Sequence, residues 1–200
     1  MTTVALIDAG GANLGSVRYA LERLGARVQV VTGASDIAAA ERVILPGVGA
    51  AAPAMGRLRA LGLVEVVRHL QQPLLGICLG MQLLYEASDE GNVECLGVLP
   101  GRVAKLAASP GTRVPHMGWN RLHIERRDPL LDGIEPHDQA YFVHGYAAPV
   151  TAATLASCDH GGPFAAVVRS GNRCGAQFHP ERSASVGARL LENFLADRNP

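Results

Sequence analysis

The chain has 200 residues, of which 48% are apolar, and its 18 basic and 18 acidic side chains give a formal net charge of zero. Such a chain is expected to form one domain, over residues 1–200, and it has no long basic run of the kind that nucleic-acid binding needs. The first apolar segment, Val4 to Ile7, stops at Asp8, so we expect neither secretion nor a membrane span.

The four cysteines are Cys78, Cys95, Cys158 and Cys174, and they show neither a Cys-x-x-Cys pair nor a metal-ligand spacing. We therefore expect reduced thiols, a cytoplasmic location, and no metal or other cofactor. All of them except Cys78 are interpreted as structural residues.

The N-terminal segment predicts a strand over Val4–Asp8 and a helix over Asn13–Leu24, with Asn13 as the N-cap and Gly25 just beyond the end. The glycine-rich loop between them partly resembles a dinucleotide-binding fingerprint. However, Ala12 stands where the middle glycine is needed, and no acidic residue closes a clear second strand. Nucleotide binding is therefore not favoured.

Strands over Arg27–Val31 and Arg42–Leu45 follow, and the second runs into the turn Pro-Gly-Val-Gly at residues 46–49. A Gly-x-Gly turn after a strand exposes main-chain N–H groups that hold anions well. By itself this turn would be an ordinary connection to a helix. Helical segments are expected within Ala50–Leu61 and Val64–Gln71.

The most informative segment is the apolar strand Leu74–Cys78, which continues as Leu-Gly-Met-Gln. Its Gly-x-Cys-x-Gly pattern is typical of a nucleophile elbow, in which a buried strand turns sharply into a helix, here expected to reach Ala87. Gly76 and Gly80 are expected where the two backbones approach too closely for a Cβ atom. The helix N-terminus favours a thiolate at Cys78, although a buried structural cysteine is the commoner role of this residue type.

Beyond Gly101 the pattern changes to short β-like runs separated by Gly, Pro and Asp turns. These runs are Arg102–Leu106, Arg121–Ile124, Tyr141–His144, Ala153–Cys158, Ala165–Arg169 and Cys174–Phe178. A final helix is expected from Ser183 to Ala196. Early parallel βα units with a later antiparallel portion predict an α/β fold, a single-domain flavodoxin-like three-layer sandwich with a mixed, mainly parallel central sheet.

A thiolate nucleophile needs a base, and the best candidate follows the last predicted strand in the sequence His179-Pro180-Glu181. In an extended segment His179 and Glu181 project to the same side, and Pro180 biases His179 toward that conformation. A carboxylate beside the imidazole sets its tautomer and stabilises the imidazolium. The motif is weak alone, but joined to the elbow it predicts a triad.

The predicted triad is Cys78, His179 and Glu181, and the predicted oxyanion hole uses N–H groups of Val48, Gly49 and Leu79. Pro-Gly-x-Gly, Gly-x-Cys-x-Gly-x-Gln and His-Pro-Glu, in this order, resemble the class I glutamine amidotransferases over nearly the whole chain. The resemblance implies that the thiolate attacks the side-chain amide of L-glutamine and releases ammonia.

We predict that the glutamine pocket uses the main chain around Gly49, the side chain of Gln82 and the segment Val143–Tyr146, which includes His144, Gly145 and Tyr146. Gln82 lies one helical turn past Cys78, so the two can face the same cleft. The resemblance further implies that Glu90 meets the α-ammonium group of glutamine.

Further residues narrow the resemblance to glutaminase subunits that serve a cyclase of histidine biosynthesis. The most specific string is Pro-His-Met-Gly-Trp-Asn at residues 115–120. The resemblance implies a heterodimer with a (β/α)₈-barrel cyclase, which uses the ammonia to make imidazole glycerol phosphate and an aminoimidazole carboxamide ribotide. The predicted docking residues are Asn13, Met117, Trp119, Asn120 and Arg182.

The chain departs from the family's usual residues at Ala9, Ala12 and Arg182, which we place near the partner-facing edge. Other interpretations stay open: a triad glutaminase subunit of another amidotransferase, a cysteine hydrolase of the same fold, and a non-catalytic docking subunit, which the intact triad disfavours. Trp119, the single tryptophan, is either a core residue or an interface anchor, and its polar neighbours favour the interface.

Overall fold

The computed structural model describes residues 1–11, 13–109 and 111–197. Its strands are β1 (Thr3–Ile7), β2 (Arg27–Val31), β3 (Arg42–Gly47), β4 (Leu74–Cys78), β5 (Tyr85–Ser88), β6 (Val93–Glu94), β7 (Leu99–Lys105), β8 (His116–Arg121), β9 (His123–Ile124), β10 (Gln139–His144), β11 (Tyr146–Ala147), β12 (Thr154–Asp159), β13 (Pro163–Ser170) and β14 (Arg173–Ala176). Its helices are α1 (Leu14–Arg23), α2 (Ala34–Ala38), α3 (Ala51–Ala60), α4 (Val64–Arg68), α5 (Leu79–Gln82) and α6 (Ala184–Ala196), with 3₁₀ turns η1 (Pro129–Leu131) and η2 (Pro180–Arg182).

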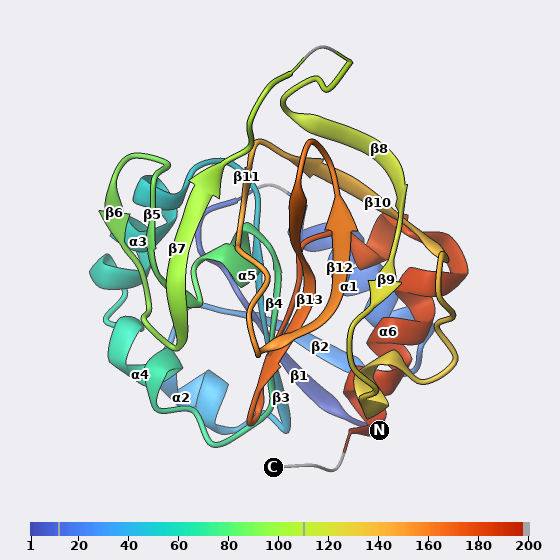
Figure 1. Cartoon of the computed structure of the whole chain (residues 1–200). Helices are drawn as coiled ribbons and strands as arrows, with labels where there is room; N and C mark the ends of the chain where they lie inside the picture. The colour runs from blue at the N-terminus through green and yellow to red at the C-terminus, as the bar shows by residue number, and fades with distance from the viewer. Residues whose placement is uncertain (12, 110, 198–200) are drawn as a thin grey trace.

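A mixed sheet with the order β2-β1-β3-β4-β14-β13-β12-β9 runs through the centre of the described part of the chain (Figure 1). The strands from β2 to β14 in this order are parallel, and β13, β12 and β9 continue the sheet in antiparallel pairs. The predicted α/β fold with a mixed, mainly parallel sheet is therefore confirmed.

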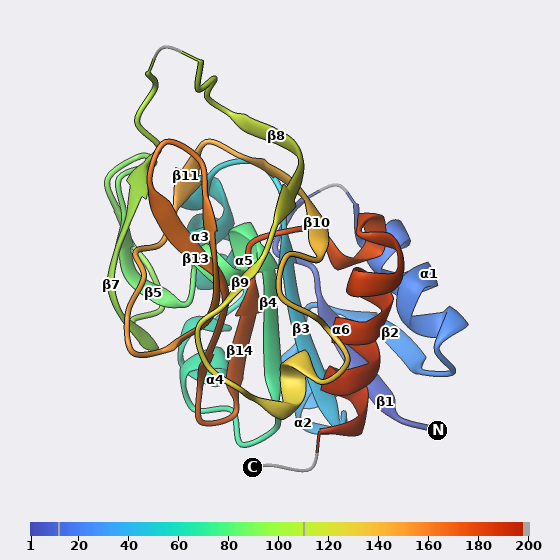
Figure 2. The same ribbon diagram turned by 45° about the vertical axis from the view of Figure 1, so that its right-hand side comes forward.

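Helices cover both faces of the sheet and close two apolar cores. Figure 2 shows α1 and α6 together on one side, where Leu21 and Phe194 are fully buried. On the other side α2, α3 and α4 bury residues such as Ile37 and Leu58. None of the helices in the described ranges combines the length and apolarity that a membrane crossing requires.

The carboxyl ends of β3, β4 and β14 lie side by side and create the place for a site. Every residue of β4 is buried, as expected for a central parallel strand covered on both faces. Gly47 at the end of β3 is in register with Cys78 at the end of β4, while Ala176 of β14 is in register with Ile77. The turn after β3, the elbow cysteine and the histidine after β14 therefore meet at one edge, where ligands of open α/β sheets usually bind.

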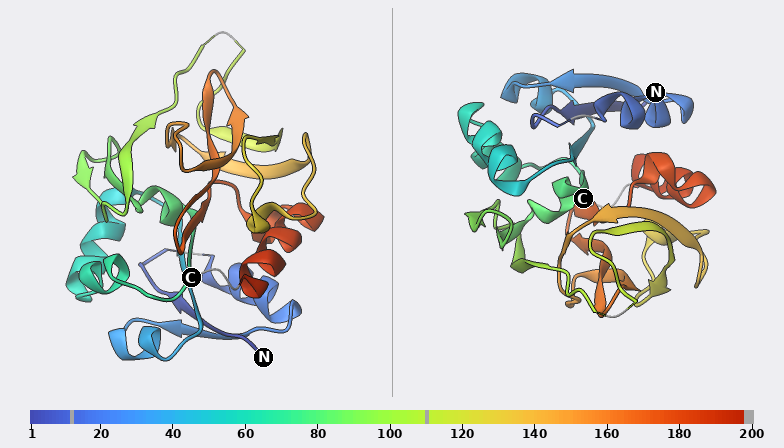
Figure 3. Two further views of the ribbon diagram at one scale, coloured as in Figure 1. Left: turned by 60° about the horizontal axis from the view of Figure 1, so that its bottom comes forward. Right: turned by 90° about the horizontal axis from the view of Figure 1, so that it is seen from above.

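Two smaller β structures flank this edge. An antiparallel ribbon of β8 and β10 lies near the carboxyl end of β4, and Figure 3 shows it from above beside α6. The described residues also form a four-stranded sheet of order β11-β7-β5-β6. Its strand β6 contacts α3. These structures bring residues from the second half of the chain over the elbow.

The expected helix from the elbow to Ala87 is wrong, because α5 ends at Gln82 and β5 begins at Tyr85. The carbonyl of Leu83 accepts from Leu96 N–H, and that of Leu84 accepts from the N–H groups of Val98 and Leu99. Since these long-range bonds use the carbonyls that would continue a helix, the tertiary pairing overrides the local preference.

The sequence interpretation also missed α2, β5, β6, β11, η1 and the greater part of β8. Short elements such as these carry little periodicity of their own. The expected strand Arg121–Ile124 is split between the end of β8 and β9, and the final helix is confirmed as α6.

Candidate active site

Cys78 sits at the strained turn between β4 and α5. Its backbone has φ 52° and ψ −110°, a conformation that non-glycine residues rarely adopt. A Cβ atom on Gly80 would lie 1.7 Å from the carbonyl oxygen of Leu45, and one on Gly76 would lie 2.7 Å from the carbonyl oxygen of Gly80. The predicted close approach of strand and helix is therefore confirmed. Because α5 has a single turn, its dipole contributes less to a thiolate than the longer predicted helix would.

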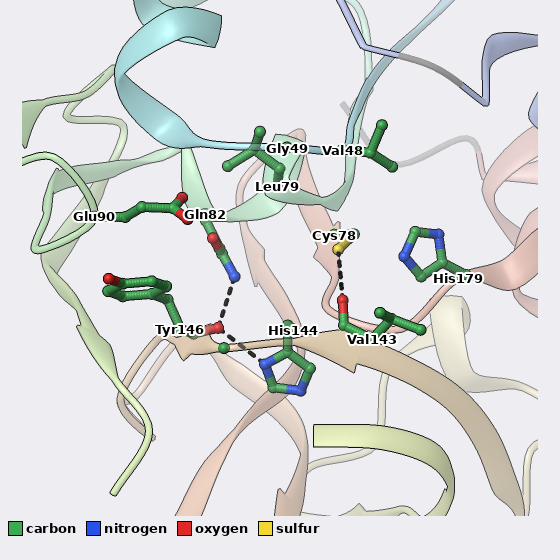
Figure 4. A pocket seen from close by; sticks show the side chains of 11 residues that line it. Val48, Gly49, Cys78, Leu79, Gln82, Glu90, Val143, His144, Tyr146 and His179 are labelled. Atoms are coloured by element: carbon green, nitrogen blue, oxygen red, sulfur yellow. Dashed lines mark hydrogen bonds between the residues drawn. The ribbon is translucent and has the colours of Figure 1, made fainter. Parts of the chain in front are cut away.

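His179 and Glu181 face the elbow from the segment that follows β14. The His179 Nδ1 atom lies 2.8 Å from Glu181 Oε1, and both side chains are nearly buried. His179 itself is extended, as expected, with φ −95° and ψ 99°, but the segment does not stay extended, because Pro180 begins the 3₁₀ turn η2 and Glu181 lies within that turn. The pairing nevertheless leaves the Nε2 side of the ring toward Cys78, which Figure 4 shows across the pocket.

Asn13 makes an unexpected contact with the same carboxylate. It occupies the N-cap position of α1 with φ 89°, but its side chain does not cap the helix. Instead Asn13 Nδ2 donates to Glu181 Oε1 over 2.7 Å. The side chain predicted to dock a partner thus holds Glu181, the third member of the predicted triad.

The electrostatics of the triad favour an ion pair. Burial alone would lower the pKa of His179, but hydrogen bonds and charges from Cys78 and Glu181 outweigh it and raise the pKa to about 10. Burial opposes ionisation of Glu181, yet the hydrogen bond and charge of His179 and the Asn13 amide bring its pKa below the usual range. The arrangement therefore holds an imidazolium beside the Glu181 carboxylate, facing the sulfur of Cys78.

A cavity of about 170 Å³ opens directly over Cys78 and His179 (Figure 4). Its lining contains the residues predicted for the oxyanion hole and the substrate: Val48, Gly49, Leu79, Gln82, Glu90, His144, Gly145 and Tyr146, together with Val143. Glu90 also accepts a hydrogen bond from the N–H of Ala51 at the start of α3, over 2.9 Å. The structure thus gathers segments from across the chain around one small pocket.

The amide of Gln82 lines this pocket, and the fully buried amide of Gln177 lies behind it. Gln82 Nε2 donates to the carbonyl oxygen of Tyr146 over 2.7 Å and to Gln177 Oε1 over 2.9 Å. Gln177 Nε2 in turn lies 3.7 Å from Cys78 Sγ. Gln177 was not predicted as a site residue, although a polar residue two positions before His179 at a strand end was a usable indication.

The predicted docking residues separate into two groups. Met117 and Trp119 are exposed, at 65% and 50%, and lie on one face of β8. Trp119 packs edge-on against Tyr141 at 5.9 Å between ring centroids, and the Arg182 guanidinium lies 5.2 Å from the centre of the Tyr141 ring. We call Met117, Trp119, Tyr141 and Arg182 the docking face.

The other predicted docking positions do not belong to the docking face. The amide of Asn120 contacts His116 and the carbonyl of Asp159, on the opposite side of β8 from Trp119. Ala9 is buried, with only 6% of its surface exposed, so its expected place at the partner-facing edge is wrong. Ala12 lies outside the described residues.

Comparison with known proteins places this geometry in a family. The family model described as glutamine amidotransferase class-I matches residues 5–198. The chain is similar to the imidazole glycerol phosphate synthase subunit HisH of Xanthomonas oryzae pv. oryzae (strain MAFF 311018), with 67% identity and 98% of each chain covered. The chain is also similar to the imidazole glycerol phosphate synthase subunit HisH of Xylella fastidiosa (strain Temecula1 / ATCC 700964), with 63% identity and 98% of each chain covered.

Solved structures show the same fold at lower identity. A crystal structure described as a glutamine amidotransferase superimposes with a TM-score of 0.75 at 22% identity, covering 96% of this chain and 97% of the other. The structure of PurLQS from Thermotoga maritima gives a TM-score of 0.73 at 22% identity, covering 98% and 99%. These two likenesses concern the fold.

Proposed function

The chain belongs to the class I glutamine amidotransferase family, and we propose that Cys78, His179 and Glu181 hydrolyse glutamine for an imidazole glycerol phosphate synthase. The 67% identity to subunits of that enzyme supports this assignment over another amidotransferase of the family. The observation that carries the chemistry is the strained Cys78 facing a buried His179–Glu181 pair across the pocket. We place this biosynthetic subunit in the cytoplasm.

In the first half-reaction the Cys78 thiolate attacks the carbon of the side-chain amide. The His179 imidazolium donates its proton to the leaving nitrogen, the C–N bond breaks, and ammonia leaves behind a thioester. In the second half-reaction neutral His179 takes a proton from water, whose oxygen attacks the thioester carbon. The C–S bond then breaks, and glutamate and the thiolate are released.

Negative charge develops on the carbonyl oxygen of the amide in the first half-reaction and of the thioester in the second. We propose that the main-chain N–H groups of Val48, Gly49 and Leu79 donate hydrogen bonds to this oxygen. Their place in the lining of the pocket beside Cys78 supports this role. Glu90 lies across the pocket from His179, and its carboxylate suits the α-ammonium group of glutamine. Gln82 and the Tyr146 main chain complete the polar wall that selects an amino acid of this shape.

A subunit of a synthase has a partner subunit, and the proposed partner is the cyclase that consumes the ammonia. Ammonia released into neutral water would become mostly ammonium, which is not nucleophilic, so direct delivery is an advantage. We propose that the cyclase, of the (β/α)₈-barrel type, docks on Met117, Trp119 and Arg182, beside the triad. The exposed side chains of Met117 and Trp119 and the Arg182 guanidinium over the Tyr141 ring support that choice.

The proposal is tested with the complex of this chain and its cyclase. Cys78→Ala should lower the rate of imidazole glycerol phosphate formation from glutamine by at least about 10³-fold. The rate of formation from added ammonium salt should stay near that of the unmodified complex. The buried Cys95 provides a matched control, since Cys95→Ala should leave both rates unchanged. Persistent glutamine-dependent turnover in Cys78→Ala would rule out the proposed nucleophile.

A further inference from the structure

Behind the pocket lies a pair of buried histidines that have no part in the half-reactions of the triad. His116 begins β8, His144 ends β10, and the two residues face each other in the register of the ribbon. The His116 Nδ1 atom lies 3.0 Å from His144 Nε2, and the two side chains are 4% and 6% exposed. His144 reaches the lining of the pocket, whereas His116 does not.

The hydrogen-bond partners at one end of the pair determine its tautomers. His144 Nδ1 lies 2.9 Å from the carbonyl oxygen of Tyr146, which only accepts, so Nδ1 carries the proton. A neutral His144 then presents a bare Nε2 to its partner, and His116 Nδ1 must donate to it. The same logic leaves His116 Nε2 as an acceptor.

The other end of the pair leads independently to the same result. Asn120 Oδ1 accepts from the N–H of Arg121 over 2.8 Å, and Asn120 Nδ2 donates to the carbonyl of Asp159 over 2.9 Å. These two main-chain partners orient the amide, whose remaining N–H points to His116 Nε2 at 3.2 Å. Both ends therefore require the same proton arrangement, in which each histidine is neutral and donates through Nδ1.

Burial supports the neutral state of both rings. It lowers the pKa of His116 to about 4, aided by His160, and lowers that of His144 to about 3 despite the hydrogen bond to Tyr146. A second proton on His144 would also set two N–H donors against each other across 3.0 Å, and one on His116 would face the Asn120 amide N–H across 3.2 Å.

The chain of donors continues to the nucleophile. The carbonyl of Tyr146 accepts from both His144 and Gln82, so two bonds hold its direction. The second N–H of the Gln82 amide donates to Gln177 Oε1, which turns Gln177 Nε2 toward the Cys78 sulfur. An uninterrupted series of hydrogen bonds thus runs from β8 to the sulfur.

We propose that His116 is a positioning residue for Cys78, acting through His144, the Tyr146 carbonyl and the two glutamine amides to orient the N–H that meets the sulfur. The role rests on the proposed function, since it serves the attack of the thiolate. Loss of the His116 donor frees His144 to rotate or to change tautomer, releases the Tyr146 carbonyl and lets both amides turn. Of the proposed substrate contacts, Glu90 and Gly49 lie outside this series, whereas Gln82 and Tyr146 belong to it.

Two substitutions separate positioning from packing. His116→Phe keeps a ring against Phe142 and His160, whose centroids lie 4.9 and 4.1 Å away, but removes the donor. His116→Asn keeps an N–H near the Nδ1 position but loses the ring. Positioning predicts about a tenfold loss of glutaminase kcat in the Phe variant, a rise in KM smaller than the loss of kcat because Gln82 and Tyr146 also line the substrate pocket, and recovery of kcat to within about threefold in the Asn variant.

The control is His160→Phe, because His160 stacks on His116 but directs its Nε2 to the carbonyl of Arg113 instead of joining the series. Its kcat should be unchanged. All kinetic constants are measured in the complex with the cyclase. If the Phe variant keeps full kcat, or if activity follows thermal stability with Asn worse than Phe, the positioning role is wrong.

Two further readouts do not depend on glutamine hydrolysis, and the first of them needs no variant. Nitrogen-15 NMR of the histidine rings in the unmodified full chain should show Nδ1–H tautomers for both His116 and His144, and an Nε2–H tautomer at either would overturn the proposal. The rate of iodoacetamide reaction at Cys78 should fall in His116→Phe and stay unchanged in His160→Phe. If the unmodified complex hydrolyses no glutamine, the proposed function fails while these readouts still judge the positioning role.

Discussion

Cys78 differs from the other cysteines in what surrounds its sulfur. It shares a pocket with the imidazole of His179, whose pKa is raised by the sulfur itself and by Glu181. Burial raises the pKa of the Cys95 thiol to about 11 and those of Cys158 and Cys174 to about 12. At neutral pH a thiol with a pKa of 11 is ionised in only about one molecule in 10⁴.

Iodoacetamide at pH 7 should therefore alkylate Cys78 and leave the other thiols of the folded chain unmodified. The reaction at Cys78 depends on the imidazolium, which persists from neutral pH up to about pH 10. His179→Asn should slow the labelling by at least about tenfold, as followed by mass spectrometry of peptides. Equal labelling of Cys78 and Cys95 would contradict the ion pair and favour a structural role for Cys78.

The elbow between β4 and α5 needs glycines where its backbone contacts neighbouring strands. At Gly80 the backbone of α5 presses on the carbonyl of Leu45 in β3, and the space for a side chain is already occupied by backbone atoms. At Gly175, a Cβ atom would lie 2.6 Å from the Met81 side chain, which can move more readily. The elbow is thus held by the neighbouring strands, and the helix after it needs only one turn.

Gly80→Ala should destabilise the fold by more than about 3 kcal/mol, because the new methyl group meets backbone that cannot yield. The matched control is Gly56, in the exposed interior of α3, where a Cβ atom would meet nothing within 4 Å. Gly56→Ala should stabilise the chain by roughly 0.5–1 kcal/mol. Urea unfolding of both variants checks the pair, and a mild effect at Gly80 would show that β3 and α5 can separate.

Across the molecule as a whole, the docking face and the triad are joined through short segments. Arg182 belongs to η2 together with Glu181, and Tyr141 accepts, through its carbonyl, the N–H of His179 over 3.0 Å. A partner that covers Trp119 and Arg182 would therefore press on the segment that carries the base. This arrangement fits a glutaminase whose ammonia is consumed by a neighbouring subunit.

Trp119→Ala should weaken binding to the cyclase by about 30-fold and leave the thermal stability of the isolated chain within about 1 °C, because half of the indole is exposed. Val30→Ala, at a 42% exposed position on the edge strand β2, serves as the control and should leave binding unchanged. Calorimetric titration and thermal unfolding measure the two quantities. A stability loss with unchanged binding would make Trp119 a structural residue and disprove this docking assignment.

The linear sequence was sufficient to predict the class of fold, the elbow, and three residues that the fold brings together as the proposed triad. Leu74–Cys78 is apolar throughout, as a strand buried on both faces must be, and the glycines around Cys78 are required by contacts that any such elbow makes. These features are local, so a reading along the chain finds them. His179 and Glu181 were found in the same way, although their turn was taken for an extended segment.

Only the tertiary structure decided which polar groups from distant parts of the chain contact one another. The end of α5 at Gln82 depends on carbonyls taken by residues 96–99, and the inward directions of Asn13 and Asn120 depend on Glu181 and Asp159. Gln177 and His116 acquire their partners because β4, β14 and the β8–β10 ribbon converge at one edge. Such hydrogen bonds join residues up to 168 positions apart, and no local pattern encodes them, because the direction of a polar side chain is set by whichever partner the fold brings within reach.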